Sequence, residues 1–219
     1  MGQTKHGRSG LVLVAVLMAG LLALPSTGLA QLGGLLPPPP TSTSTTPTVV
    51  GNASAAQVVL LGLLGTATST SLASTGISSA NAESDVGQVT GSIPSLLGAE
   101  VLNAATYSYP DQVDSAVSLA NLNMSVAGIG IYADSVVAEA SQVLGAAGSG
   151  TSYIDNLSIN GMPVAVTGAP NQTIWVPGGQ VIINEQTISS TGTAVVNALH
   201  VAITGVADVV IASATAGIS

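Results

Sequence analysis

The chain has 219 residues with ten Asp and Glu against two Lys and Arg, which gives a formal net charge of −8 at pH 7. Both cations, Lys5 and Arg8, lie near the N-terminus, so residues 31–219 carry every carboxylate and no Lys or Arg. A surface without cations cannot neutralise phosphates, which excludes nucleic-acid binding, and it also disfavours anionic lipid head groups. Ion pairs are therefore expected to contribute little, and apolar burial and backbone hydrogen bonds must stabilise the fold.

Residues 1–30 are predicted to be a secretory signal peptide. Lys5 and Arg8 form a positively charged N-terminal region, residues 11–24 are an apolar run of 14 residues, and Gly28-Leu29-Ala30 fits a signal-peptidase cleavage site. A membrane-spanning helix needs about 20 residues, so an uncleaved anchor is the less favoured alternative. We expect an exported protein with no integral membrane span after processing. The chain has no cysteine, which excludes a lipid-modified N-terminal cysteine and leaves the core without a disulfide.

Residues 31–48 are predicted to be a linker rich in Pro, Ser and Thr. Pro37 to Pro40 are four consecutive prolines, which favour an extended polyproline II helix, and the Ser/Thr tract that follows has nothing to bury. We interpret the segment as a spacer. An O-glycosylated stalk and a ligand for a proline-binding domain are the alternatives.

A single β-rich domain is predicted over residues 49–219. Residues 57–64 are apolar and fit a buried strand or a short helix, and Gly62 argues against the helix. Residues 66–95 are expected to form short strands and loops. Whether residues 49–100 fold together with the C-terminal half is left open by the sequence.

Alternating patterns begin near residue 99. One side of a strand is expected to hold Ala99, Val101, Asn103, Ala105, Tyr107 and Tyr109. Leu122, Met124 and Val126 are predicted to point inward from a second strand. Residues 131–143 fit a strand better than a helix because glycines flank them and the valines are β-branched. Residues 145–150 are expected to be a flexible break between two halves.

The C-terminal half has the pattern of an antiparallel meander. Short apolar runs alternate with turns at Asn160-Gly161, Pro177 to Gly179, residues 189–192 and Thr204-Gly205, and the Asn-Gly pair fits a type I′ hairpin. With no Phe and one Trp, the core must be filled by Val, Ile, Leu and Ala, so two sheets can approach closely. The predicted fold is an all-β antiparallel β-sandwich, with a β-solenoid as the alternative.

The C-terminal half also resembles the choice-of-anchor P family of exported bacterial proteins. The similarity rests on Ile154-Asp-Asn-Leu-Ser-Ile-Asn-Gly161, Ala169-Pro-Asn171, Ile183-Asn-Glu-Gln186, Val196-Asn-Ala-Leu-His-Val201 and Ala207-Asp-Val-Val-Ile-Ala212. It covers residues 101–218. It implies a domain of unknown function that is joined to varied sorting tails and has no known catalytic residues. The sequence shows no sorting motif after the domain, so we expect a released protein or one held at the surface without a covalent anchor.

Catalysis, cofactor binding and metal binding find little support in the residues. His200 is the one histidine after residue 30 and lies within an alternating run, where a structural role is more common than a Ser–His–Asp site. A glycosidase would need paired carboxylates, and its cleft is usually lined with aromatics that this chain lacks. Asp111, Asp114 and Asp155 are weak calcium candidates without an EF-hand loop. The acids are expected to be solvated and to prevent wrong pairing at the sheet edges. Residues 184–186 are expected to form a bulge or turn with satisfied amides.

Trp175 has two interpretations: the largest core residue, which we favour, or an exposed platform for a sugar. Together with Tyr153, and with Tyr107, Tyr109 and Tyr132 as further aromatics, it is the candidate glycan contact. We predict a non-enzymatic secreted or cell-surface protein with a structural or adhesive role in the envelope or extracellular matrix. A carbohydrate-binding module is the alternative and a hydrolase a distant third. The expected partners are an envelope glycan or a second copy of the chain.

Overall fold

Residues 47–61 and 67–219 of this protein are described by a computed structural model, and all their regular elements are β-strands. These residues belong to one structural unit, Ser44–Ser219. The predicted signal peptide and nearly all of the predicted linker lie outside the described residues. The strands are β1 (Val49–Leu61), β2 (Ala67–Ser74), β3 (Ala82–Ile93), β4 (Leu97–Ser108), β5 (Gln112–Val126), β6 (Ile129–Val143), β7 (Ser149–Asp155), β8 (Ser158–Ile159), β9 (Met162–Pro163), β10 (Gln172–Val176), β11 (Gly179–Ile188), β12 (Ala194–Ile203) and β13 (Ala207–Ile218).

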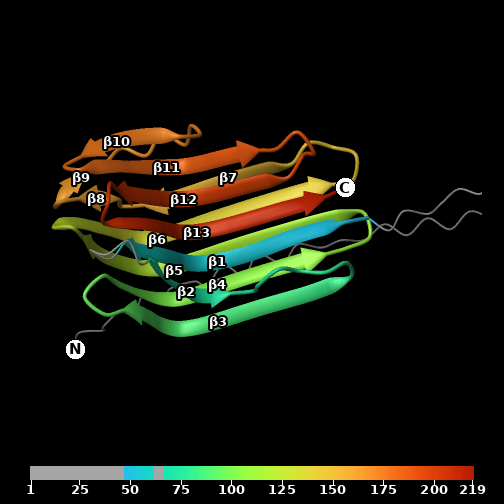
Figure 1. Cartoon of the computed structure of the whole chain (residues 1–219), viewed down its shortest axis with the longest axis horizontal. Helices are drawn as coiled ribbons and strands as arrows, with labels where there is room; N and C mark the ends of the chain where they lie inside the picture. Colours follow the sequence, from blue (N-terminus) through green and yellow to red (C-terminus); the bar gives the residue numbers. More distant parts are fainter. Residues whose placement is uncertain (1–46, 62–66) are drawn as a thin grey trace, which may run out of the picture. The chain divides into compact units, whose positions relative to one another are not determined.

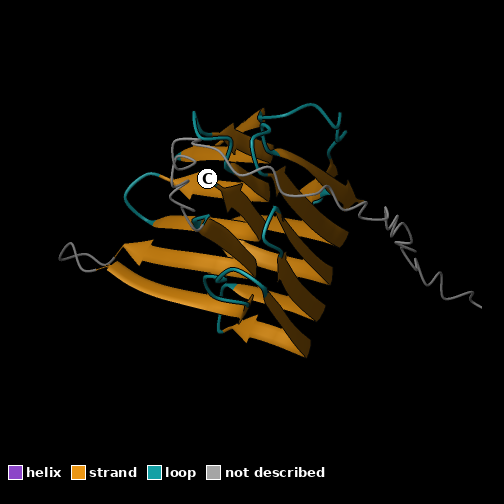
Figure 2. Cartoon of the chain, turned by 90° about the vertical axis from the view of Figure 1, so that its right-hand side faces the viewer, coloured by secondary structure: helices purple, strands orange, loops and turns teal. Residues whose placement is uncertain are grey.

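The strands form two antiparallel sheets that pack face to face (Figures 1 and 2). Sheet A has the order β10-β11-β12-β13-β1-β2, and sheet B has the order β3-β4-β5-β6-β8-β9, with β7 also paired to β6. β13 lies against β5 and β6, and β1 lies against β4 and β5. The predicted antiparallel β-sandwich is therefore confirmed.

The core between the sheets is built from small and medium aliphatic side chains, as the composition predicts. Leu122, Met124 and Val126 of β5 are buried as expected, and Leu199 and Ile211 of the opposite sheet are completely buried. Small side chains also let backbones meet closely. A Cβ on Gly150 of β7 would clash with Val196 of β12 and with the backbone carbonyl of Glu139.

The N-terminal strands are part of the same sandwich as the C-terminal ones. β1 pairs with β13 along nearly its whole length and with β2 on its other side. Just before β1, Thr48 and Ser219 exchange two backbone hydrogen bonds of 2.7 and 3.0 Å. The question left open by the sequence is thus answered, because residues 49–100 fold with the C-terminal half.

Each sheet contains a line of residues, running across neighbouring strands, at which the alternation of inward and outward side chains is reversed. In sheet A, Asn184, Ala212 and Ala73 have positive φ and lie at matching positions of β11, β13 and β2. Along β12 the buried residues are therefore Ala194, Val196 and Ala198, and then Leu199, Val201 and Ile203. In sheet B, Val101, Asn121 and Asn156 have positive φ. Such an irregularity moves the side chains that follow it to the opposite face of the sheet from the one that regular alternation would give.

Most predicted strands and turns are present. Residues 57–61 continue β1 as a strand, and residues 131–143 lie in the strand β6 rather than in a helix. Asn160 and Gly161 have φ of 51° and 74°, as a type I′ turn requires. Residues 66–95 are more regular than expected, since they contain the strands β2 and β3.

Three predictions about the arrangement are wrong. Val101 lies at an irregularity of β4 where the alternation is reversed. Before it Ala99 is buried, and after it Leu102, Ala104 and Thr106 are buried, so the predicted set from Ala99 to Tyr109 does not share one face. Residues 145–150 do not separate two halves, because Ser141 of β6 pairs directly with Ser149 of β7. The C-terminal meander is also divided between the sheets, with β7 to β9 in sheet B and β10 to β13 in sheet A.

Candidate functional site

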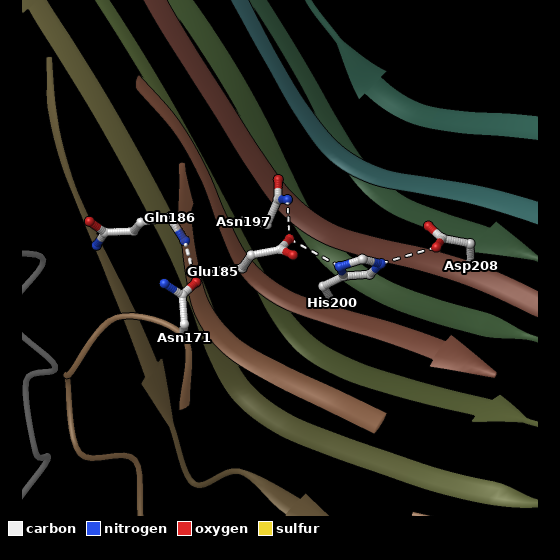
Figure 3. Close-up of polar contacts among 6 residues, drawn as sticks. All are labelled: Asn171, Glu185, Gln186, Asn197, His200 and Asp208. Carbon is white, nitrogen blue, oxygen red and sulfur yellow. Dashed lines mark hydrogen bonds and ion pairs between the residues drawn. The ribbon is translucent and has the colours of Figure 1, made fainter. Parts of the chain in front are cut away.

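The outer face of sheet A carries a polar cluster centred on His200 of β12 (Figure 3). Its Nδ1 lies 3.0 Å from Oε2 of Glu185 on β11, and its Nε2 lies 3.1 Å from Oδ2 of Asp208 on β13. The imidazole therefore joins three neighbouring strands. Neither carboxylate can be recognised as a partner from the sequence, because the contacts depend on how the strands pair.

Amide side chains extend the cluster along β11 and β12. Asn197 Nδ2 donates a 2.6 Å hydrogen bond to the same Glu185 Oε2 that contacts His200. The backbone N–H of Gln186 donates to Asn171 Oδ1, which lies just before β10. Asn197 and His200 thus hold the same oxygen of Glu185, and Asn171 ties the segment before β10 to β11.

The segment 184–186 is the interruption that the sequence predicts. Asn184 has a φ of 53°, and its Nδ2 donates to the carbonyl of Gly168 at 2.9 Å. Gln186 Nε2 donates to Asn184 Oδ1 and to the carbonyl of Gly150. Both amide NH2 groups of this segment have partners, so Asn184 and Gln186 tie it to the chain near Gly168 and Gly150 and support the cluster.

The electrostatics of the cluster favour a protonated ring. Burial acts to lower the pKa of His200, but the hydrogen bonds to Glu185 and Asp208, together with their charges, raise it above its ordinary value. An imidazolium donates from both nitrogens, which matches the two carboxylate contacts. The expectation that ion pairs contribute little is therefore incomplete, because a histidine supplies the missing cation here.

This arrangement differs from a Ser–His–Asp site. In such a site one ring nitrogen faces a carboxylate and the other faces the nucleophilic hydroxyl. Both nitrogens of His200 face carboxylates instead, so neither faces a nucleophilic hydroxyl. The geometry is that of a cross-strand brace.

Trp175 is exposed, which contradicts the favoured interpretation of a core residue. Its side chain is 78% exposed, whereas Ile174 and Val176 on either side of it pack against the core. Consecutive residues of a strand point to opposite faces, so a tryptophan between two inward residues must point outward. Trp175 lies on the outer face of sheet A, beside Gln180 of β11.

The other candidate aromatics are not gathered around Trp175. Tyr153 of β7 is 59% exposed, and because its neighbour Ile154 is buried, its ring lies on the outer face of sheet B. Tyr132 is exposed on the same sheet, Tyr107 is half-buried, and Tyr109 follows the end of β4. Trp175 and Tyr153 therefore belong to opposite outer faces, and one glycan cannot stack on both.

Several acids have polar partners on the exposed surface. Glu83 and Asp85 are exposed on the edge strand β3, as the prediction that acids protect the sheet edges requires. Asn121 Nδ2 donates to Glu100 at 2.7 Å, and Asp134 accepts from Asn156 Nδ2 at 2.5 Å and from the Tyr132 hydroxyl at 2.9 Å. The bonds from Asn156 and Tyr132 lower the pKa of Asp134, and the same hydroxyl bond raises the pKa of Tyr132. Asparagines at the positive-φ positions were the one available signal for these contacts, since asparagine tolerates that conformation.

The calcium candidates do not meet. Asp114 accepts a 2.7 Å hydrogen bond from Gln112, and Asp111 and Asp155 lie in other parts of sheet B and its turns. Within residues 47–61 and 67–219, no group of three or more Asp, Glu, His or Cys side chains converges as metal ligands would. The same residues include no helix that is long and apolar enough to cross a membrane.

Comparisons of the chain with family models, with curated proteins and with solved structures find no match. The similarity to the choice-of-anchor P family therefore stays a prediction from the residues quoted above.

Proposed function

We propose that this chain is a non-enzymatic secreted or cell-surface protein whose β-sandwich has a structural or adhesive role in the cell envelope or extracellular matrix. One observation carries the proposal most directly. The single basic side chain among the described residues, His200, has both ring nitrogens against carboxylates, so it braces three strands instead of serving a substrate.

Two further features support this role. The pairing of β1 with β13 and the Thr48–Ser219 hydrogen bonds close the sandwich at its terminal strands, which suits a domain that must resist unfolding at a surface. The predicted signal peptide would export this domain, and the Pro/Ser/Thr-rich linker would form an extended N-terminal segment ahead of it.

Expression of the full chain in a bacterial host tests export and role together. We expect a mature protein that begins at Gln31, as measured by mass spectrometry, and that sediments with isolated cell envelopes. Retention of residues 1–30 in the soluble cell extract would contradict the proposed export. Hydrolysis of glycoside or ester substrates that is abolished by His200→Ala in a folded protein would contradict the non-enzymatic role.

Carbohydrate binding is the second candidate, and the exposure of Trp175 favours it. An exposed indole offers an apolar face on which the C–H face of a sugar can stack, and the amide of Gln180 on the adjacent strand can bind a hydroxyl. Trp175 is the single tryptophan, so its fluorescence reports binding without interference. Glycan-array binding that is lost in Trp175→Ala and kept in Tyr153→Ala would establish this function, while equal loss in both variants would argue against it.

A further inference from the structure

The strand β3 forms an open edge of sheet B. It runs over 12 residues from Ala82 to Ile93 and pairs with β4 on one side. No other described strand pairs with its second side, and Figure 1 shows it as the outermost strand. In an antiparallel ladder alternate residues turn both backbone groups away from the partner strand, so about six residues of β3 present unpaired N–H and C=O groups.

The other sheet edges are shorter or interrupted. β10 has five residues, β7 has seven, and β9 has two, one of which is Pro163. β2 has eight residues and begins next to a segment that is not described. Proteins normally protect edges by such shortening, by proline or by charged side chains. β3 is the longest of these edges and contains no proline, and its exposed charges are those of Glu83 and Asp85, so strand addition there requires a strand that matches these charges.

The charge on β3 selects the kind of strand that it can accept. Glu83 and Asp85 are exposed and alternate along the strand, so both point to the outer face of sheet B. Residues 44–219 contain no Lys or Arg. Pairing of β3 with the same edge of a second copy would therefore bring in further carboxylates and no cation, and like charges on paired strands destabilise a sheet. A strand with Lys or Arg at alternating positions meets these carboxylates favourably.

The surface beside Asp85 has room for a long side chain. A shallow depression of about 240 Å³ starts at Asp85 and Asn103 and continues over Ala105 and Ala116 to Glu139. The methylene stem of a lysine or arginine on the added strand can lie along β3 and bring its charged end to Asp85, at the near end of this depression. On the same strand Val89 is 82% exposed, and an added strand would cover part of it.

We propose that β3 accepts an additional strand from a partner polypeptide that carries basic side chains at alternating positions. The backbone groups of β3 supply the hydrogen bonds, and Glu83 and Asp85 supply the selectivity. This site is separate from the proposed envelope role and from glycan binding at Trp175, because it uses a different sheet and a different edge.

A synthetic octapeptide of alternating lysine and valine tests the proposal on the full chain. We expect it to bind at least about tenfold more tightly than the matched glutamate–valine peptide and to slow hydrogen exchange of β3 amides. Two further peptides carry N-methyl groups on every lysine or on every valine. One of them should lose binding, because its methyl groups replace the N–H groups that face β3, and the other should keep it.

Binding of both N-methylated peptides would overturn the proposal, since attraction by charge alone needs no backbone N–H. Protection of amides outside β3 would also overturn it, and so would concentration-dependent pairing of two copies through β3 in the absence of peptide. The double variant Glu83→Gln/Asp85→Asn should weaken lysine-peptide binding about five- to tenfold. The control Asp111→Asn/Asp155→Asn removes the same charge from other parts of the surface and should keep nearly full affinity, so an equal loss in both variants counts against the proposal.

Discussion

The ring of His200 on β12 is joined to Glu185 on the neighbouring strand β11, with Nδ1 of the histidine 3.0 Å from Oε2 of the carboxylate. Asp208 on β13 faces the other ring nitrogen. Asn197 is the uncharged fourth member of the cluster and holds the same Glu185 oxygen. A single imidazole thus links three strands of sheet A in a domain whose described residues contain no Lys or Arg.

This contact predicts that the free energy of unfolding falls as the pH rises through neutrality. The pKa of His200 is raised above its ordinary 6.5 in the folded protein, so the folded state binds the proton more tightly than the unfolded chain. The stabilisation is therefore complete below about pH 6.5 and is lost as the pH rises through the folded pKa. Urea unfolding measured at intervals from about pH 6 to about pH 9 should show this decline.

The variant His200→Gln is the control for this pH dependence. It keeps a side chain that can hydrogen-bond but does not titrate, so its unfolding free energy should be nearly flat over the same range. A decline of equal size in His200→Gln and in the parent protein would show that another group is responsible.

The core of small aliphatic residues predicts a large cost for one truncation. Leu122 is completely buried between the sheets, so Leu122→Ala should lower the free energy of unfolding by about 2–5 kcal/mol through lost burial and the cavity left behind. Val206 is 43% exposed in the turn after β12, and Val206→Ala should change it by less than about 0.5 kcal/mol. Denaturant unfolding of both variants checks the pair, and a similar small effect in each would mean that Leu122 is not a core residue.

Strand positions and the fold class could be predicted from the sequence because alternation is a local signal. Leu122, Met124 and Val126 point inward as their spacing requires. The same rule fails near Val101, since one residue with positive φ reverses the faces of the residues that follow it, and a β-branched residue gives no warning of this. The interpretation of Trp175 as a core residue fails for a related reason. In a strand of five residues the sequence does not show which alternate residues point inward, and only the packing of Ile174 and Val176 decides it.

The polar clusters could not be predicted, because their members come together through strand pairing. Glu185, His200 and Asp208 lie on three different strands, and their contacts follow from the register of β11, β12 and β13. The Asp134 contact with Asn156 depends in the same way on how the chain pairs with β6 after β7, whereas Tyr132 and Asp134 are neighbours on one face of β6. Sequence spacing carries no information on such registers until the order of the strands in the sheet is known.

Val101 is a position where a substitution should stabilise the domain. Its φ of 49° is costly for a β-branched residue, and its side chain is 55% exposed, so little burial is lost when it is replaced. Because asparagine tolerates this conformation, Val101→Asn should raise the free energy of unfolding by about 1 kcal/mol. The control Val137→Asn lies on the same sheet without a positive φ and should be neutral or destabilising. A thermal unfolding temperature that falls in both variants would contradict the strain at Val101.

A pair of glycines provides the final test, because it separates close packing around β7 from the general effect of adding a methyl group. A Cβ on Gly150 would clash with the Val196 side chain and would lie 2.7 Å from the carbonyl oxygen of Glu139. A Cβ on Gly98 meets nothing within 4 Å. Gly150→Ala should therefore lower the free energy of unfolding by about 1–3 kcal/mol, while Gly98→Ala should be neutral or stabilising by up to about 1 kcal/mol because alanine restricts the unfolded chain. Adding Val196→Ala should recover little of the loss, since the Glu139 carbonyl remains in the way. If Gly150→Ala and Gly98→Ala unfold at the same denaturant concentration, β7 does not pack against β12 as closely as the structure has it.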